Sequence, residues 1–463
     1  MNLFLIFLVA FALTAHADYK SFYFEKAQEK KWSNFAPPSR NSDDTKSSNF
    51  KQMINPQDPN DLRTFNQRYF VDTQYAARKT SPTLFYLCGE ATCNGAAGVV
   101  TYFAKRLKAN IISLEHRYYG KSQPFKELST ANLQYLSTEN ALQDAANFQK
   151  FAMNQLGFQG KWIVLGGSYA GSLAAYYRQR YPNLVVGALA SSGPVQADDN
   201  FDEYDLHVAT VAGPDCLQKI QDVVAEVESA LQNPEKLKSL KAAFSAEKLQ
   251  TDLDFVYLIA DMGALAIQYN YKDHFCELLN TTNPMEGYAK FTQEIYSDWG
   301  MNALSGSASG ATSLNPADYE SVFGMRQWFY QSCTEYGYWQ NAFPDKKRSA
   351  RSQLINSQYH REICGRLFNI EIATPIQKIN DNFFKPLLLP SASQIFFTNG
   401  ATDPWINLSL AKENGNDTNP NHSYFTISEA AHCDDLRPPK PTDLESLTEA
   451  REQFLNLATR WLE

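Results

Sequence analysis

Short apolar runs alternate with longer amphipathic segments through the first part of this 463-residue chain. Apolar or alternating residues predict strands at 63–72, 83–87, 110–115, 162–165 and 185–190. Apolar residues at helical spacing predict helices at 98–107, 139–155 and 172–181. Strands that alternate with helices favour an α/β fold, in which helices cover both faces of a mainly parallel sheet.

The pattern changes after Pro194. Helical periodicity dominates residues 215–300, and strand character returns only at 394–398 and 424–427, before a final amphipathic helix at 443–462. We therefore expect a core that is interrupted by a largely helical insertion. The expected boundaries are 18–195 for the first part of the core, 196–391 for the inserted cap domain and 392–463 for the second part.

The N-terminal residues have the pattern of a secretory signal peptide at 1–17. Their apolar run at 3–13 is too short to span a bilayer, and the small residues Ala15 and Ala17 suit a cleavage site. Residues 18–50 are polar and irregular, which predicts a surface arm or a short propeptide. We expect an endosomal, lysosomal or extracellular protein, and no later stretch is apolar enough to predict a membrane anchor.

Cysteine usage fits that oxidising route, because seven cysteines are present. Four lie in the expected insertion, so we predict at least two disulfides among Cys216, Cys276, Cys333 and Cys364. Cys88 and Cys93 form either a local disulfide or two free thiols, and the odd total leaves one cysteine unpaired or paired between chains. Acceptor sequences for N-glycosylation stand at Asn280, Asn407, Asn416 and Asn421.

The segment 161–171, KWIVLGGSYAG, joins a predicted strand to a predicted helix through a turn that carries Ser168. This arrangement is typical of the nucleophile elbow of an α/β-hydrolase, in which small residues allow the strained turn. Gly166 provides one small residue, and Ala170 stands where the strict pattern has glycine. A glycine-rich turn with an incidental serine is the alternative.

Two later residues complete a catalytic triad in the order that this fold requires, which is serine, acid, histidine. Asp403 follows the strand predicted at 394–398, and His432 follows the strand predicted at 424–427. In such a triad His432 takes the proton of Ser168, and Asp403 orients the imidazole. Each residue alone has an ordinary structural explanation, as a turn aspartate or a polar histidine.

The oxyanion formed in such a reaction needs N–H donors. We expect the backbone N–H of Tyr169 to provide one, and the N–H of Gly89 or Glu90, after the strand at 83–87, to provide the second. An esterase on the same fold and a catalytically inactive binding protein are the competing functions.

The chain resembles the family of proline-specific serine peptidases that includes lysosomal Pro-X carboxypeptidase, dipeptidyl peptidase II and thymus-specific serine protease, and it looks most like the last of these. The resemblance extends over nearly the whole chain after residue 62. The matching blocks include EHRYYGKSQPF at 115–125, YLSTENALQDAANF at 135–148, GGSYAGSLAAYYRQRYP at 166–182, RQWFYQSCTEYGYWQ at 326–340, TNGATDPW at 398–405 and AHCDDL at 431–436.

The resemblance implies a serine exopeptidase that cleaves after proline, with the triad at Ser168, Asp403 and His432. Trp328 and Tyr330 could form a proline pocket, or could be core residues of the cap. The dipeptidyl branch has an acid where Phe329 stands, so we lean away from release of N-terminal dipeptides, with Glu335 as the nearest other acid.

We expect peptide substrates and leave a homodimer open. Net charge of −8 argues against nucleic acid, and no metal ion or cofactor is expected.

Overall fold

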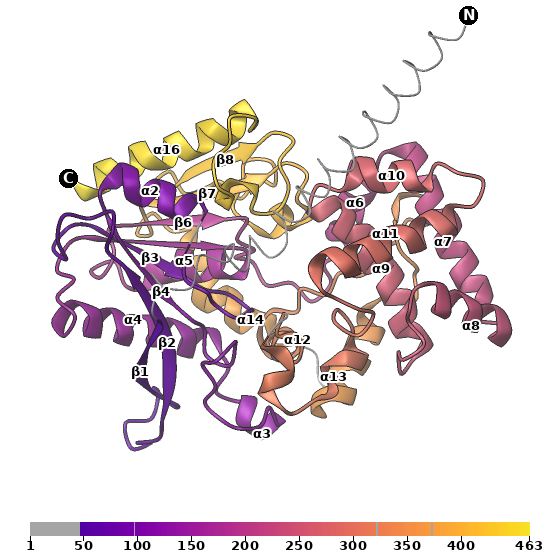
Figure 1. The fold of residues 1–463 in the computed structure, drawn as a ribbon, viewed down its shortest axis with the longest axis horizontal. Helices are drawn as coiled ribbons and strands as arrows, with labels where there is room; N and C mark the ends of the chain where they lie inside the picture. The colour runs from indigo at the N-terminus through magenta and orange to yellow at the C-terminus, as the bar shows by residue number, and fades with distance from the viewer. Residues whose placement is uncertain (1–46, 97, 321–322, 372–373) are drawn as a thin grey trace, which may run out of the picture.

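The computed structural model describes residues 47–96, 98–320, 323–371 and 374–463 (Figure 1). The expected signal peptide lies outside the described residues, as do residues 18–46 of the polar arm. The described strands form one eight-stranded sheet in the order β1-β2-β4-β3-β5-β6-β7-β8. The strands are β1 Ser47–Met53, β2 Thr64–Asp72, β3 Thr83–Leu87, β4 Asn110–Leu114, β5 Trp162–Gly167, β6 Gly187–Ser191, β7 Ile395–Gly400 and β8 Ser423–Ile427.

The sheet is mainly parallel, as predicted. Strands β1 and β2 run antiparallel at one edge, and every pairing from β4 to β8 is parallel. Strand β1 falls where the sequence predicted an irregular polar arm. Most of its side chains are exposed, and its backbone pairs with β2 along its whole length, so apolar patterning could not reveal it.

Adjacent residues of the central strands point to opposite faces of the sheet, and each face has its own core. Leu84 and Phe396 pack with helices α2 (Val99–Leu107) and α16 (Glu445–Leu462) on one face. Phe85 and Phe397 belong to the larger core that includes α4 (Thr138–Asn154) and α5 (Tyr169–Arg180) on the other face. Because successive side chains of a strand point to opposite faces and both faces are buried, nearly every residue of these strands has to be apolar.

The segment between β6 and β7 forms the cap, which is largely helical as predicted. In Figure 1 the cap lies beyond one end of the sheet. Its α-helices are α6 Glu203–Ala212, α7 Pro214–Ala230, α8 Pro234–Ala243, α9 Asp252–Gln268, α10 Lys272–Leu279, α11 Pro284–Trp299, α12 Met325–Gln331, α13 Ser357–Phe368, α14 Ile376–Ile379 and α15 Lys385–Leu387. Short 3₁₀ or π turns lie at Ala308–Thr312, Pro316–Tyr319, Ser332–Tyr336, Lys346–Arg348 and Asn380–Phe384. The core adds helix α3 (Thr130–Leu133) and 3₁₀ turns at Pro404–Leu408 and Asp434–Leu436.

Two disulfides connect parts of the cap, which confirms the prediction for its four cysteines. Cys216 of α7 bonds Cys276 of α10, and Cys333 bonds Cys364 of α13. Cys88 and Cys93 form a third, local disulfide next to the sheet. The remaining cysteine is a buried free thiol, Cys433.

Candidate active site

Ser168 lies at the turn between β5 and α5, where the backbone is in a conformation that L-residues seldom adopt. Its φ is 56° and its ψ is −133°. A Cβ added at Gly166 would lie 2.0 Å from the carbonyl oxygen of Ala170, so only glycine fits this position. The methyl group of Ala170 has room on the side of Gly89, because even a Cβ added at Gly89 would lie 3.6 Å from it. The turn therefore has the strained geometry of a nucleophile elbow.

Asp403 and His432 are hydrogen-bonded to each other in the interior. His432 Nδ1 lies 2.7 Å from Asp403 Oδ2, and the two residues are 1% and 0% exposed. The other oxygen of Asp403 accepts a hydrogen bond from Trp405 N at 3.0 Å, which fixes the carboxylate after β7. Burial lowers the pKa of His432, but the adjacent Asp403 carboxylate and Cys433 together outweigh burial and raise this pKa well above its usual value.

The loop that carries His432 packs directly against the elbow. A Cβ at Gly167, which precedes Ser168, would lie 3.1 Å from Sγ of Cys433, which follows His432. Both loops also bind the end of β6, because Ser168 N donates to Ser191 O at 2.9 Å and Cys433 N donates to Ser192 Oγ at 3.0 Å. The structure thus pairs His432 with Asp403 and places the loop that carries His432 beside the elbow that carries Ser168.

The loop after β3 lies against the first residues of α5. Gly89 faces both the backbone nitrogen and the methyl group of Ala170. Tyr169 is the first residue of α5, and its N–H is one of those that a helix leaves without an intrahelical partner. The Gly89–Glu90 loop therefore lies beside the start of α5.

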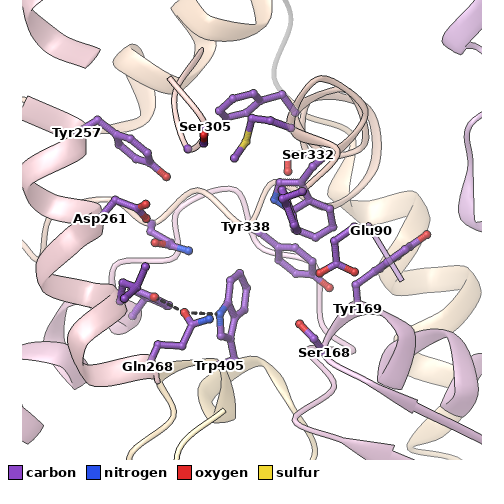
Figure 2. Close-up of a pocket in the computed structure, with 18 of the residues that line it drawn as sticks. Glu90, Ser168, Tyr169, Tyr257, Asp261, Gln268, Ser305, Ser332, Tyr338 and Trp405 are labelled. Carbon is purple, nitrogen blue, oxygen red and sulfur yellow. Dashed lines mark hydrogen bonds between the residues drawn. The ribbon is translucent and has the colours of Figure 1, made fainter. Parts of the chain in front are cut away.

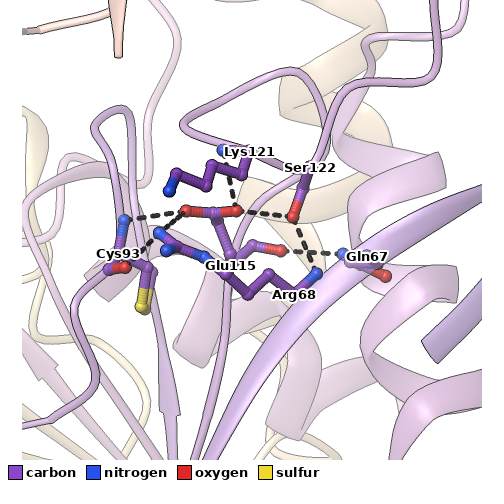
Figure 3. Close-up of a disulfide and its surroundings, with 7 residues drawn as sticks. Gln67, Arg68, Cys93, Glu115, Lys121 and Ser122 are labelled. Atoms are coloured by element: carbon purple, nitrogen blue, oxygen red, sulfur yellow. Dashed lines mark hydrogen bonds and ion pairs between the residues drawn. A yellow bond between two sulfur atoms is a disulfide. The ribbon is translucent and has the colours of Figure 1, made fainter. Parts of the chain in front are cut away.

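Glu115 holds that loop in place from the end of β4 (Figure 3). Its Oε1 accepts hydrogen bonds from Arg68 Nη2 at 2.5 Å and from Cys93 N at 3.0 Å, and its Oε2 accepts from Ser122 Oγ at 2.7 Å. Because the Cys88–Cys93 disulfide closes the same loop, Gly89 and Glu90 lie between two fixed points.

Glu90 brings a buried carboxyl group close to the candidate triad. The residue is 3% exposed, and its Oε2 has no hydrogen-bond partner among the described residues. Burial raises the pKa of Glu90 to about 7, and the nearby His432 opposes this rise. Such a carboxyl group takes up a proton near neutral pH, far above the range of an exposed glutamate.

A cavity of about 180 Å³ opens between the elbow and the cap (Figure 2). Ser168, Tyr169 and Glu90 line it from the core, and residues of α9, α11 and α12 line it from the cap. Aromatic residues dominate its lining: Tyr204, Tyr257, Tyr269, Trp299, Phe323, Trp328, Phe329, Tyr338, Trp339 and Trp405. The site therefore combines a serine at the entrance to α5 with a flat apolar surface.

The structure separates the three cap residues that the sequence proposed for substrate binding. Trp328 lines the cavity and stacks on the ring of Tyr338 at an interplanar angle of 29°, with centroids 6.1 Å apart. Tyr330 lies outside the lining and packs its ring edge-on against Phe368. Glu335 also lies outside it, because its carboxylate accepts hydrogen bonds from the backbone and hydroxyl of Thr138 at the start of α4.

Helix α9 contributes site residues that the sequence analysis missed. Tyr257, Asp261, Leu265 and Gln268 all line the cavity, and their spacing places them on one face of the helix. Gln268 also fastens the cap to the site, because its carbonyl accepts from His432 N at 3.0 Å and its side chain accepts from Trp405 Nε1 at 3.0 Å. The sequence feature that could have identified them was Asp261, the single charged residue in the otherwise largely apolar run at 255–269.

The four candidate glycosylation sites differ in exposure. Asn280 and Asn421 are exposed, whereas Asn407 and Asn416 are half-buried. The side-chain amide of Asn407 donates to Pro404 O at 2.9 Å, and Ser409 of the same acceptor sequence is fully buried.

Over the part of the chain that the structure describes, the helices are too short or too polar to cross a bilayer. The same residues contain no cluster of histidine, cysteine or acidic side chains that could hold a metal ion.

The mainly parallel sheet, the serine elbow and the buried acid–histidine pair define a serine hydrolase of the α/β-hydrolase fold. Residues 52–454 match the family described as serine carboxypeptidase S28, and the chain belongs to this family. A probable serine protease from Arabidopsis thaliana, EDA2, is 32% identical over 89% of this chain and 88% of its own length. The protein is therefore a serine-type peptidase.

Two further relatives carry more specific names. Mouse thymus-specific serine protease is 31% identical, over 89% of this chain and 86% of its own length. Human lysosomal Pro-X carboxypeptidase is 27% identical, over 89% of this chain and 87% of its own length.

Proposed function

We propose that this peptidase is an exopeptidase that cleaves after proline and uses Ser168 as its nucleophile. The observation that carries the proposal is the buried hydrogen bond between Asp403 and His432, on a loop that packs against the elbow. Asp403 holds Nδ1 and so leaves Nε2 as the nitrogen that takes the proton of Ser168. The raised pKa of His432 suits a base that must hold this proton until the leaving amine takes it.

The reaction proceeds through an acyl-enzyme. The oxygen of Ser168 attacks the scissile carbonyl, His432 protonates the departing amine, and a water activated by His432 then releases the acyl group. The N–H of Tyr169 and an N–H of Gly89 or Glu90 stabilise the oxyanion, and one such donor contributes about 3 kcal/mol to transition-state stabilisation.

The preference for proline is supported by the cavity lining next to the serine. Trp328, Tyr338 and Trp405 present flat apolar surfaces, and a pyrrolidine ring packs well against such surfaces. The relative named Pro-X carboxypeptidase supports the same preference.

The cap supports the restriction to chain ends. We place its boundaries at residues 196–391, so that it follows the last core residues before α6 and ends before β7. Helix α9 binds the His432 loop, so the cap lies over the cleft and excludes folded proteins from it. The three disulfides and the N-terminal pattern support a secretory-pathway or lysosomal location.

The triad is tested by labelling with a fluorophosphonate probe and by peptide hydrolysis. Wild-type protein should be labelled at Ser168, and Ser168→Ala should not be labelled. The peptidase activity of Ser168→Ala should fall at least a hundredfold, because removal of a triad residue normally lowers kcat by much more than this. The far-UV and near-UV circular dichroism of the variant should match the wild type. Retained hydrolysis in Ser168→Ala would disprove the assignment of the nucleophile.

A further inference from the structure

The ionisable side chains that line the cavity beside Ser168, apart from its tyrosines, are all acidic. Two carboxyl groups, of Glu90 and Asp261, line it, whereas the described lining residues include no lysine, arginine or histidine. A substrate carboxylate placed in this apolar cavity would meet like charge, whereas a substrate cation would meet opposite charge. The lining therefore favours one end of a peptide, its amino terminus.

Asp261 lies on the cap side of the cavity, across from the elbow (Figure 2). It extends from the middle of α9, and its Oδ2 lies close to Gly306. The described residues provide no hydrogen bond or ion pair to its carboxyl group. Burial raises the pKa of Asp261 to about 6, with the charge of Arg351 opposing the rise. The carboxylate is thus kept in an apolar setting without a partner.

The nearest cation is already engaged elsewhere. Arg351 donates from Nη1 to Gln340 O at 2.5 Å, and its Nε lies 3.5 Å from Asp205 Oδ1. The guanidinium is buried and does not line the cavity, so it cannot bind a substrate carboxylate there without leaving these partners. Glu90 adds the second observation, since one of its oxygens is buried, without a hydrogen-bond partner among the described residues, and belongs to the same cavity lining.

We infer that Asp261 is a specificity-determining residue that binds the free α-ammonium group of a peptide substrate, so that the protein releases dipeptides from amino termini. The inference rests on the proposed peptidase function and assigns its direction. The amine of a dipeptide unit lies about 7 Å from the scissile carbonyl, which requires an acid away from Ser168, across the cavity. Phe329 lines the same cavity from α12 without a charge, and Asp261 is the acid that the described residues of the cap contribute to the lining.

The inference is tested with matched peptides at neutral pH, in which Asp261 is ionised. The substrates are Ala-Pro-Ala-Phe-amide with a free α-amine, its N-acetyl form, and N-acetyl-Lys-Pro-Ala-Phe-amide. The wild type should cleave the free-amine peptide after proline at least tenfold faster than both acetylated peptides. Asp261→Asn should lower kcat/KM for the free amine roughly ten- to hundredfold, since a charge-assisted hydrogen bond is worth about 1.5–3 kcal/mol, and should not lower it for acetyl-Ala-Pro.

Two variants separate this role from a structural one. Asp261→Glu keeps the charge and should restore part of the preference for a free amine. Asp252→Asn makes the same chemical change on α9, at an exposed site that pairs with Lys241, and should leave the preference unchanged. Fluorophosphonate labelling of each variant shows whether the protein is folded and Ser168 is reactive, and it does not depend on the α-amine of a substrate.

Three outcomes would overturn the inference while leaving the peptidase function intact. These are equal cleavage of free and acetylated peptides, cleavage of Ala-Pro-Ala-Phe with a free C-terminal carboxylate but of none of the three amides, and an Asp261-dependent preference for the acetylated lysine peptide. Absence of labelling at Ser168 in the wild type would instead refute the proposed function itself.

Discussion

At the residue scale, the unusual group is the carboxyl of Glu90. An ionised carboxylate beside a developing oxyanion would raise the energy of the transition state, because like charges repel strongly in a buried site. Burial favours the neutral acid and raises its pKa to about 7. At acidic pH Glu90 is therefore uncharged, and the oxyanion donors that we propose in its loop would act without an opposing charge.

This raised pKa predicts a pH dependence of stability. The native state holds the Glu90 proton up to about pH 7, whereas an unfolded glutamate releases it near 4.5. Native protein therefore binds more protons between these values, and its stability falls as pH rises through this window. Relative to Glu90→Gln, the wild type should lose roughly 3 kcal/mol of unfolding free energy from pH 4.5 to pH 7.

Urea denaturation of both proteins across this range measures the difference, in which the contributions of other titrating groups cancel. The Glu90→Gln variant keeps the size and polarity of the side chain, so packing changes little. Parallel stability curves for the two proteins would show that Glu90 has an ordinary pKa and would contradict the prediction.

At the element scale, the cap depends on covalent connections between its helices. The disulfide from Cys216 to Cys276 closes a loop of 60 residues, which includes α8 and α9. Closing a loop of this length lowers the entropy of the unfolded chain and stabilises the fold by about 4 kcal/mol in the chain-entropy description. Because α9 carries Asp261 and Gln268, this disulfide also supports the substrate side of the site.

Replacing both Cys216 and Cys276 by serine should therefore destabilise the cap and weaken substrate binding. We expect a loss of about 4 kcal/mol in unfolding free energy, a raised KM and a smaller change in kcat. Guanidinium denaturation and steady-state kinetics measure these effects. An unchanged denaturation midpoint would show that packing of α7 against α10 suffices without the bond.

Most elements and the candidate triad could be predicted from the sequence, but the substrate side of the site could not. Ser168, Asp403 and His432 each follow a strand, so period-2 apolar patterning and chain order locate them. Asp261 lies inside a helix, and its place in a cavity depends on how α9 packs against loops far away in sequence. Patterning also failed at β1, where backbone pairing rather than buried side chains forms the strand.

At the scale of the whole molecule, the cap and the core enclose the cleft beside Ser168. Besides the contacts of Gln268 with the His432 loop, the hydroxyl of Tyr338 donates to Pro194 O, and Gln196 N donates to Leu408 O at 3.0 Å. These bonds fasten the cap to the loops at the carboxyl ends of the strands. A chain end can enter the cavity beneath the cap, whereas a continuous chain would have to pass through it on both sides.

This enclosure predicts that the protein distinguishes chain ends from identical sequences without ends. A linear peptide that begins Ala-Pro should be cleaved after proline, and a head-to-tail cyclic peptide with the same residues should react at least a hundredfold more slowly. The cyclic peptide has the same side chains but no ammonium group for Asp261 and no end to place under the cap. Mass spectrometry of timed digests gives both rates, and Ser168→Ala gives the background.

Acetylation of the linear peptide separates the two causes. The acetylated peptide lacks the charge but still has an end, so its rate should fall between those of the free linear and the cyclic peptides. Cleavage of the cyclic peptide at the rate of the acetylated linear peptide would show that the cap opens widely enough to admit a continuous chain. In that case the limit on substrate size would come from the charge at Asp261 and not from the enclosure.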